Sequence, residues 1–260
     1  MISISGSLLR DLVPMRDAID AVRHAYMKVS AGAIEQPTRL ALKGGSALAM
    51  LARDSGSGAT VLKALTIRPD NPKAGRPAIQ ALVVLFDGAP GAPSALIDGR
   101  SLTALRTGAA SGVGTDLLAA EDARTMVMIG AGAQSADQIR AVCAVREIRE
   151  VRVVSRTADS AQNLMSRMAS ELLRDARLVV VDEMEAAMAE AGDLLQAIGR
   201  GQLNVENIKE IGALLKDPPP RSGGWTVFKS VGIAAQDLEV AQLAVARARE
   251  SGQGVEVAGL

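Results

Sequence analysis

The hydrophobic pattern of the first half of the chain predicts one amphipathic helix followed by a series of short strands. Apolar residues recur at helical spacing between Pro14 and Val29, and Gly32 suits the end of that helix. Turn-forming segments such as SGSG and DGAPGAP separate the strands that follow. These strands are predicted at 39–42, 47–51, 60–67, 79–86 and 94–97. A helix rich in small residues is predicted over 101–119, where its composition permits close backbone approach.

From residue 124 the pattern changes to strands that alternate with helices. Strands are predicted at 125–130, 150–155, 177–182 and 225–231, and helices at 133–145, 158–173, 183–198, 205–215 and 234–250. Such alternation is typical of βαβ units around a parallel sheet. The fold class is therefore predicted as α/β.

Composition and charge exclude several classes of function. The chain carries 29 Lys and Arg against 29 Asp and Glu and only a few aromatic residues, so we predict that it binds no nucleic acid. No uncharged apolar run approaches the ~20 residues that span a bilayer, and the start lacks a signal-peptide pattern. We therefore predict a cytoplasmic protein without membrane association. Cys143, the only cysteine, is predicted to be buried and inert, and His24, the only histidine, to lie at the surface. These two residues are too few for a metal site rich in Cys and His.

A glycine pair between the strand at 125–130 and the next helix carries the first candidate chemistry. In a dinucleotide-binding turn, the first glycine permits a tight bend and the second lets the backbone approach a pyrophosphate at the helix N-terminus. The alternative interpretation is an ordinary turn. The candidate cofactor-binding residues in this loop are Gly130, Ala131, Gly132, Ala133 and Gln134.

The end of the second strand of this region bears on the type of cofactor. An acidic residue there usually binds the ribose 2′-hydroxyl of NAD, whereas an arginine accommodates the 2′-phosphate of NADP. The chain has Ser155, Arg156 and Thr157 at this place. This favours NADP(H), with NAD(H) as the alternative, unless Arg156 is simply a solvated arginine.

Three cationic side chains are candidates for binding a carboxylate. Lys63 lies in TVLKALTI, on the same strand face as Val61 and Leu65, where burial of an ammonium needs a compensating anion or polar groups. A lysine on a solvent-facing edge is the alternative. Arg39 and Arg106 could be ordinary surface arginines, but a guanidinium is also the natural bidentate partner of a carboxylate.

Taken together, these segments resemble the ornithine cyclodeaminase/mu-crystallin family over nearly the whole chain. The matching blocks, in order, are Pro37-Thr38-Arg39, Lys63, Asn71-Pro72, Gly75-Arg76-Pro77, Gln80, Leu85-Phe86-Asp87, Leu96-Ile97-Asp98-Gly99, Leu102-Thr103-Ala104-Leu105-Arg106-Thr107, Gly130-Ala131-Gly132-Ala133-Gln134, Phe228-Lys229-Ser230-Val231-Gly232 and Gln236-Asp237-Leu238.

The resemblance implies two domains and assigns roles to individual residues. Residues 1–120 and 225–260 would form an α+β substrate-binding and dimerisation domain, and residues 121–224 a Rossmann-like nucleotide-binding domain. Arg39, Lys63 and Arg106 would hold the carboxylate of an amino or imino acid. Thr107 would contact cofactor phosphate, and the turn at 231–232, Val231 and Gly232, would close over the nicotinamide. The assembly implied is a homodimer.

The same comparison indicates a missing block near residues 169–174. In the family, that block carries nicotinamide contacts and the acidic catalytic residue of the cyclodeaminases. The chain is therefore either a naturally shortened member or the sequence lacks a segment. We expect a Rossmann-like domain that is shorter than usual.

Three functions follow from the resemblance. The first is an NAD(P)H-dependent reductase of a cyclic imino acid such as pyrroline- or piperideine-2-carboxylate, with Lys63 as the catalytic residue. The second is ornithine cyclodeaminase, an NAD-dependent lyase that forms proline and ammonia and needs the missing acidic residue. The third is a crystallin-like protein that binds nucleotide without turnover.

Overall fold

The computed structural model of the chain describes residues 1–130, 132–154, 176–220 and 225–257. The chain forms two compact units. Residues 1–106 and 233–260 make the first unit, and residues 107–232 make the second. The predicted domain boundaries at 120 and 225 stay a prediction. None of the helices in the described ranges is both long and apolar enough to cross a membrane.

The first unit is built on an eight-stranded mixed sheet with the path β13-β1-β7-β6-β5-β4-β2, in which β3 also pairs with β4. Its β1 runs parallel to β7, and the pairs from β7 to β2 are antiparallel. The strands are β1 (Ile2–Ile4), β2 (Ile34–Glu35), β3 (Leu40–Ala41), β4 (Ala47–Asp54), β5 (Thr60–Ile67), β6 (Ile79–Phe86), β7 (Pro93–Asp98) and β13 (Val255–Glu256).

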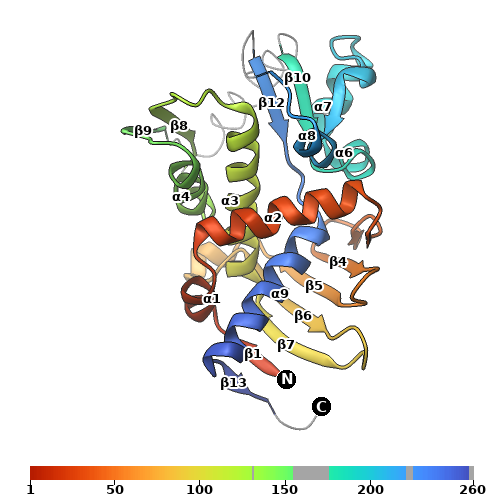
Figure 1. The fold of residues 1–260 in the computed structure, drawn as a ribbon, viewed down its shortest axis with the longest axis vertical. Helices are drawn as coiled ribbons and strands as arrows, with labels where there is room; N and C mark the ends of the chain where they lie inside the picture. Colours follow the sequence, from red (N-terminus) through yellow and green to blue (C-terminus); the bar gives the residue numbers. More distant parts are fainter. Residues whose placement is uncertain (131, 155–175, 221–224, 258–260) are drawn as a thin grey trace. The chain divides into compact units, whose positions relative to one another are not determined.

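Helices cover one face of this sheet (Figure 1). They are α1 (Gly6–Leu12), α2 (Met15–Ser30) and α9 (Ala234–Ser251), and a 3-10 turn lies at η1 (Asn71–Ala74). α9 lies on β4 and β5, with α2 beside it. Its buried face is mostly alanine and valine, so the helix can sit close to the sheet, and it ends at Gly252 in the left-handed conformation.

One continuous helix, α3 (Gly99–Leu118), runs across the boundary between the two units. Two of its glycines make close contacts within the second unit. A Cβ at Gly108 would lie 2.6 Å from the backbone oxygen of Asp137, and one at Gly114 would lie 2.5 Å from the ring of Phe228. The small residues noted in the sequence are thus required by packing.

The second unit contains two separate parallel sheets in its described part: β8 with β9, and a three-stranded sheet of order β11-β10-β12. Its elements are β8 (Thr125–Ile129), α4 (Ser135–Val145), β9 (Glu150–Val154), β10 (Ala176–Val181), α6 (Met184–Glu190), α7 (Gly192–Gly199), η2 (Val205–Asn207), β11 (Ile208–Glu210), α8 (Ile211–Lys216) and β12 (Trp225–Lys229). The parallel pairing confirms the predicted α/β class.

Three local predictions are wrong. The helix predicted at 205–215 contains β11, because Ile208 pairs with Val179 at the edge of β10. The helix predicted at 183–198 is interrupted at Ala191, which has non-helical torsion angles. Cys143 is exposed, because α4 buries Asp137 and Ala141 and turns position 143 away. The helix predicted at 158–173 lies outside the described residues.

Candidate functional site

A lysine is buried inside the first unit, at the middle of β5. Lys63 pairs across the sheet with Met50 of β4 and Val83 of β6, and its side chain is 1% exposed. The alternation of β5 turns it toward the helix-covered face together with Val61. The solvent-facing alternative for this lysine is therefore wrong.

The buried ammonium is compensated by a carboxylate from α9. Lys63 Nζ donates to Asp237 Oδ2 at 2.6 Å, and the Asp237 side chain is completely buried. The other oxygen of this carboxylate, Oδ1, lies 3.3 Å from Arg106 Nε. One carboxylate thus bridges two cations, which is the kind of pairing that a buried charge requires.

Arg106 is held by a second residue of the same helical turn. Its Nη1 donates to Gln236 Oε1 at 2.8 Å, and Gln236 Nε2 donates to the hydroxyl of Tyr26 at 2.6 Å. The Arg106 side chain is 7% exposed, so the surface alternative for this arginine is wrong as well. Within the described residues, neither Arg106 Nε nor Asp237 Oδ1 has a partner in hydrogen-bond geometry.

The surroundings of Lys63 lower its pKa below that of an exposed lysine. Burial lowers the pKa of Lys63 to about 8, and the positive charges of Arg106 and Arg39 act in the same direction, whereas Asp237 opposes them. Arg39, which is half-buried, is therefore near enough to act on Lys63. The structure brings all three predicted cations into one electrostatic environment.

The glycine loop of the second unit lies between the end of β8 and the start of α4, which is where a dinucleotide-binding turn would lie. Gly130 has φ +99°, which L side chains rarely adopt. Apart from the chain neighbours, none of the described residues has an atom within 4 Å of the Cβ positions of Gly130 and Gly132. The Ser135 hydroxyl donates to the Gly130 carbonyl at 3.2 Å, closing the turn. Gln134 precedes α4 and makes no side-chain hydrogen bond to cap it. The N–H groups of Ser135 and Asp137 donate to the carbonyls of Gly132 and Gln134, both at 3.1 Å, and the buried Asp137 lies in the first turn of the helix.

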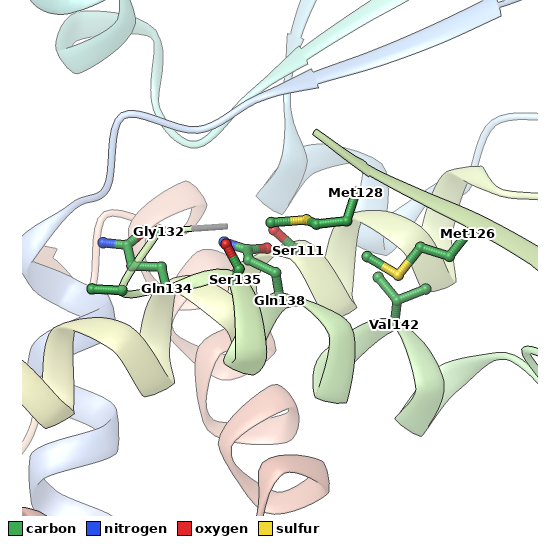
Figure 2. Close-up of a pocket in the computed structure, with 9 residues that line it drawn as sticks. Ser111, Met126, Met128, Gly132, Gln134, Ser135, Gln138 and Val142 are labelled. Atoms are coloured by element: carbon green, nitrogen blue, oxygen red, sulfur yellow. The ribbon is translucent and has the colours of Figure 1, made fainter. Parts of the chain in front are cut away.

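An open pocket of about 620 Å³ adjoins this loop. In Figure 2, Met126 and Met128 point from β8 toward α4, where Ser135, Gln138 and Val142 line the opposite side. Gly132, Ala133 and Gln134 contribute the loop itself to the lining. The uncrowded backbone at Gly130 and Gly132 beside this pocket is the feature that a pyrophosphate-binding loop requires. Ala131, Ser155, Arg156 and Thr157 lie outside the described residues.

The remaining predicted cofactor residues occupy constrained positions. Thr107 Oγ1 is buried and makes no hydrogen bond to any of the described residues. The N–H groups of Val231 and Gly232 both donate to Asp182 Oδ2 at 2.8 Å, and the Ser230 hydroxyl donates to the same oxygen at 2.8 Å. Asp182 therefore fixes the turn at 231–232, in which Gly232 has φ +80°.

Residues 8–171 match the profile of the ornithine cyclodeaminase/mu-crystallin family. The chain is a member of this family. Over 323 aligned positions it is 30% identical to a Delta(1)-pyrroline-2-carboxylate reductase of Bacillus cereus, with 99% of both chains covered. Since this chain has 260 residues, the alignment includes positions at which it has none.

Solved structures of the family show the same fold. The Thermococcus litoralis Delta(1)-pyrroline-2-carboxylate reductase, in complex with NADH and L-proline, is 28% identical and superposes with a TM-score of 0.88, covering 99% of this chain and 100% of its own. An archaeal alanine dehydrogenase dimer with bound NAD is 23% identical, with a TM-score of 0.85 and coverage of 100% and 99%. The predicted family and fold class are confirmed.

Sequence reasoning missed three polar residues of the two sites. Gln236 and Asp237 were noted only as part of the family resemblance, although they are the polar residues on the otherwise apolar buried face of α9. Asp182 follows a run of buried valines directly, which is a position where a functional carboxylate is common in α/β folds. Among the described residues, no group of three or more His, Cys, Asp or Glu side chains is arranged to hold a metal ion.

Proposed function

We propose that this chain is an NAD(P)H-dependent reductase that converts a cyclic imino acid, of the pyrroline- or piperideine-2-carboxylate type, to the cyclic amino acid. The observation that carries the proposal is the buried cluster in which one carboxylate, Asp237, faces two cations, Lys63 and Arg106. With Arg39 nearby, this cluster has an excess of positive charge that suits the carboxylate of a substrate. The reductases among its relatives support this assignment.

The roles proposed for these residues follow from their chemistry. Arg39 and Arg106 bind the substrate carboxylate and orient the C=N bond. The nicotinamide cofactor, when bound, supplies the hydride that adds to the imine carbon. Lys63 holds the proton that passes to the imine nitrogen as the double bond is reduced, so the product is a neutral secondary amine before it takes up solvent protons. A lysine with a pKa of about 8 is suited to this donation near neutral pH.

The cofactor-binding residues are proposed from the loop geometry. The backbone at 130–134 would hold the pyrophosphate at the N-terminus of α4, with Thr107 at a phosphate and the turn at 231–232 over the nicotinamide. The proposed preference for NADP(H) rests on Arg156, together with the hydroxyls of Ser155 and Thr157. NADH and NAD are the cofactors bound in two solved relatives, and NAD(H) is therefore the alternative to be tested beside it.

The experiment that tests the function is a cofactor-oxidation assay on the purified protein. Delta(1)-pyrroline-2-carboxylate is supplied with NADPH or NADH, and the product is identified by chromatography against L-proline. An intact mass near 26.9 kDa identifies the chain under test. We expect cofactor consumption equal to proline formed, and loss of at least about a hundredfold in kcat for Lys63→Met. Cofactor binding without oxidation would instead favour the crystallin-like function.

The cyclodeaminase alternative is tested in the same preparation. L-ornithine is supplied with catalytic NAD, and ammonia release is measured. Proline and ammonia formed in equal amounts from ornithine would overturn the reductase proposal. We expect no ammonia, because the acidic loop of the cyclodeaminases is part of the block that we propose to be missing near 169–174. The family profile match ends at residue 171, which supports this position for the gap.

We further propose that the protein acts as a homodimer formed through the first unit. The face of its sheet that lies away from α9 exposes large apolar side chains: Leu40, Leu42, Leu51 and Leu82. Patches of this kind on a soluble protein usually mark an interface between subunits. The related archaeal alanine dehydrogenase is a dimer.

A further inference from the structure

We infer that Asp237 is a positioning residue. It holds the Lys63 ammonium and the Arg106 guanidinium at the separation that substrate binding and proton donation require. This inference rests on the proposed function, which assigns Lys63 and Arg106 to the substrate. It adds a residue to which the family resemblance in the sequence gave no role. Asp237 acts through its two neighbours and is itself completely buried.

The geometry distinguishes the two contacts of this carboxylate. Oδ2 accepts a short hydrogen bond from Lys63 Nζ at 2.6 Å, so the lysine is fixed in place. Oδ1 faces the buried Nε of Arg106 at 3.3 Å without hydrogen-bond geometry, so this contact is an electrostatic attraction between carboxylate and guanidinium. A guanidinium has five N–H donors, so a substrate carboxylate can accept from the Nη groups of Arg106 without displacing the Lys63–Asp237 bond.

The first turn of α9 supplies a second constraint on the guanidinium. Gln236, which precedes Asp237, accepts from Arg106 Nη1 at 2.8 Å and is anchored by its hydrogen bond to Tyr26. Two consecutive residues of one helix thus hold the two cations: Asp237 binds Lys63, and Gln236 binds Arg106. Because the helix backbone fixes their spacing, Asp237 sets the separation of the ammonium and the guanidinium.

The charges that face Lys63 explain why this carboxylate matters for its protonation. Arg106 comes from α3, Arg39 from the segment before β3, and Asp237 from α9, while the strand neighbours Met50 and Val83 carry no charge. Burial, Arg106 and Arg39 lower the pKa of Lys63, and Asp237 alone among these groups raises it. Without Asp237, Lys63 would lose its proton at a lower pH.

The test compares Asp237→Asn, Asp237→Glu and wild type with a direct readout on the lysine. The chain has seven lysines, so the Lys63 side chain can be followed by NMR of ¹³C,¹⁵N-lysine-labelled protein and assigned with Lys63→Met. We expect the Lys63 titration to move down by about one pH unit or more in Asp237→Asn. The alkaline limb of the pH–rate profile should move with it, and the dissociation constant of NADPH should stay unchanged. In Asp237→Glu the titration of Lys63 should be close to that of the wild type, because a carboxylate is again present. The KM for the imino acid should be higher than in the wild type, because the added methylene changes the distance between the Lys63 ammonium and the Arg106 guanidinium.

The control is Asp17→Asn, which removes an exposed ion pair between α2 and α9, Asp17 with Arg247, and should change neither readout. The inference is overturned if Asp237→Asn lowers only the melting temperature and leaves the Lys63 titration and the pH profile in place. If Asp237→Asn does not fold, Asp237→Glu with an unchanged KM overturns it equally. A wild-type protein without imine reduction refutes the proposed function, whereas the NMR titration still tests the coupling of Asp237 to Lys63.

Discussion

At the scale of single residues, the cluster around Lys63 has an excess of positive charge. Asp237 is one anion among three cations, and it lies in a completely buried position at the start of α9. A buried ammonium is tolerated there because its hydrogen bond to the carboxylate offsets part of the desolvation cost. The remaining positive charge is the reason we propose that the cluster binds a substrate carboxylate.

The depressed pKa of Lys63 predicts a pH limit for the reaction. A lysine is charged below its pKa, and burial followed by the charge of Arg106 brings that value to about 8. If the ammonium is the proton donor, kcat/KM should be constant below pH 7 and fall about tenfold per unit well above pH 8. Initial rates measured between pH 6 and 10 at saturating NADPH check this. A profile that stays flat to pH 10 would show that Lys63 does not donate the proton.

The cofactor preference is predicted to depend on Arg156. Arg156→Ala should lower the ratio of kcat/KM for NADPH over NADH by about tenfold or more, since an arginine–phosphate bond is charge-assisted. The matched control is Arg152→Ala, which removes an exposed arginine paired with Glu150 on β9. An equal change in both variants would assign the effect to net charge and would contradict a specific role of Arg156 in the NADPH preference.

At the scale of elements, close approaches and one fixed turn decide the geometry of the second unit. The α3 helix contacts the beginning of α4 where Gly108 faces Asp137. The turn at 231–232 is held by three hydrogen bonds to one oxygen of Asp182. Both features fix the position of backbone groups.

Replacing Gly108 should separate α3 from α4. A Cβ at this position would lie 2.6 Å from the Asp137 backbone oxygen, which cannot move aside as a side chain could. We expect Gly108→Ala to cost about 1–3 kcal/mol in the free energy of unfolding. Gly192→Ala is the control, since in the described part of the chain no residue outside its own helical turn comes within 4 Å of its Cβ position at the start of α7. Urea denaturation followed by circular dichroism measures both, and equal stabilities would contradict the predicted clash.

Replacing Asp182 should loosen the turn that follows β12. Asp182→Ala leaves the Ser230 hydroxyl and the N–H groups of Val231 and Gly232 without their acceptor, at a cost of about 1–3 kcal/mol. If this turn covers the nicotinamide, NADPH binding measured by fluorescence should weaken as well. Asp182→Asn, which keeps an acceptor oxygen, should lie between the wild type and Asp182→Ala. Unchanged NADPH affinity in Asp182→Ala would show that the turn at 231–232 does not contribute to cofactor binding.

At the scale of the whole molecule, association is predicted to depend on the apolar sheet face of the first unit. Leu51→Glu with Leu82→Glu places charges on side chains that are 43% and 47% exposed, so the folded subunit should tolerate them. Light scattering after size-exclusion chromatography should then show a monomer where the wild type is a dimer. The control is Val205→Glu, an equally exposed apolar residue (44%) of the second unit, which should leave the mass unchanged. A wild-type monomer would refute the proposed dimer.

The sequence by itself determined five of the eight strands of the first unit, the glycine loop and the family, because period-2 alternation, glycine-containing turns and ordered motifs are read along the chain. It did not predict the short strands β1, β2 and β13. It predicted β5 and β6 with their observed bounds. It did not predict β11, whose strand conformation comes from pairing with β10 across a long connection. Likewise, only the tertiary structure decided that Lys63 is buried, that Asp237 binds Lys63 and that Gln236 binds Arg106. Those contacts join residues up to 174 positions apart, and burial and charge pairing exist only once α9 lies on the sheet.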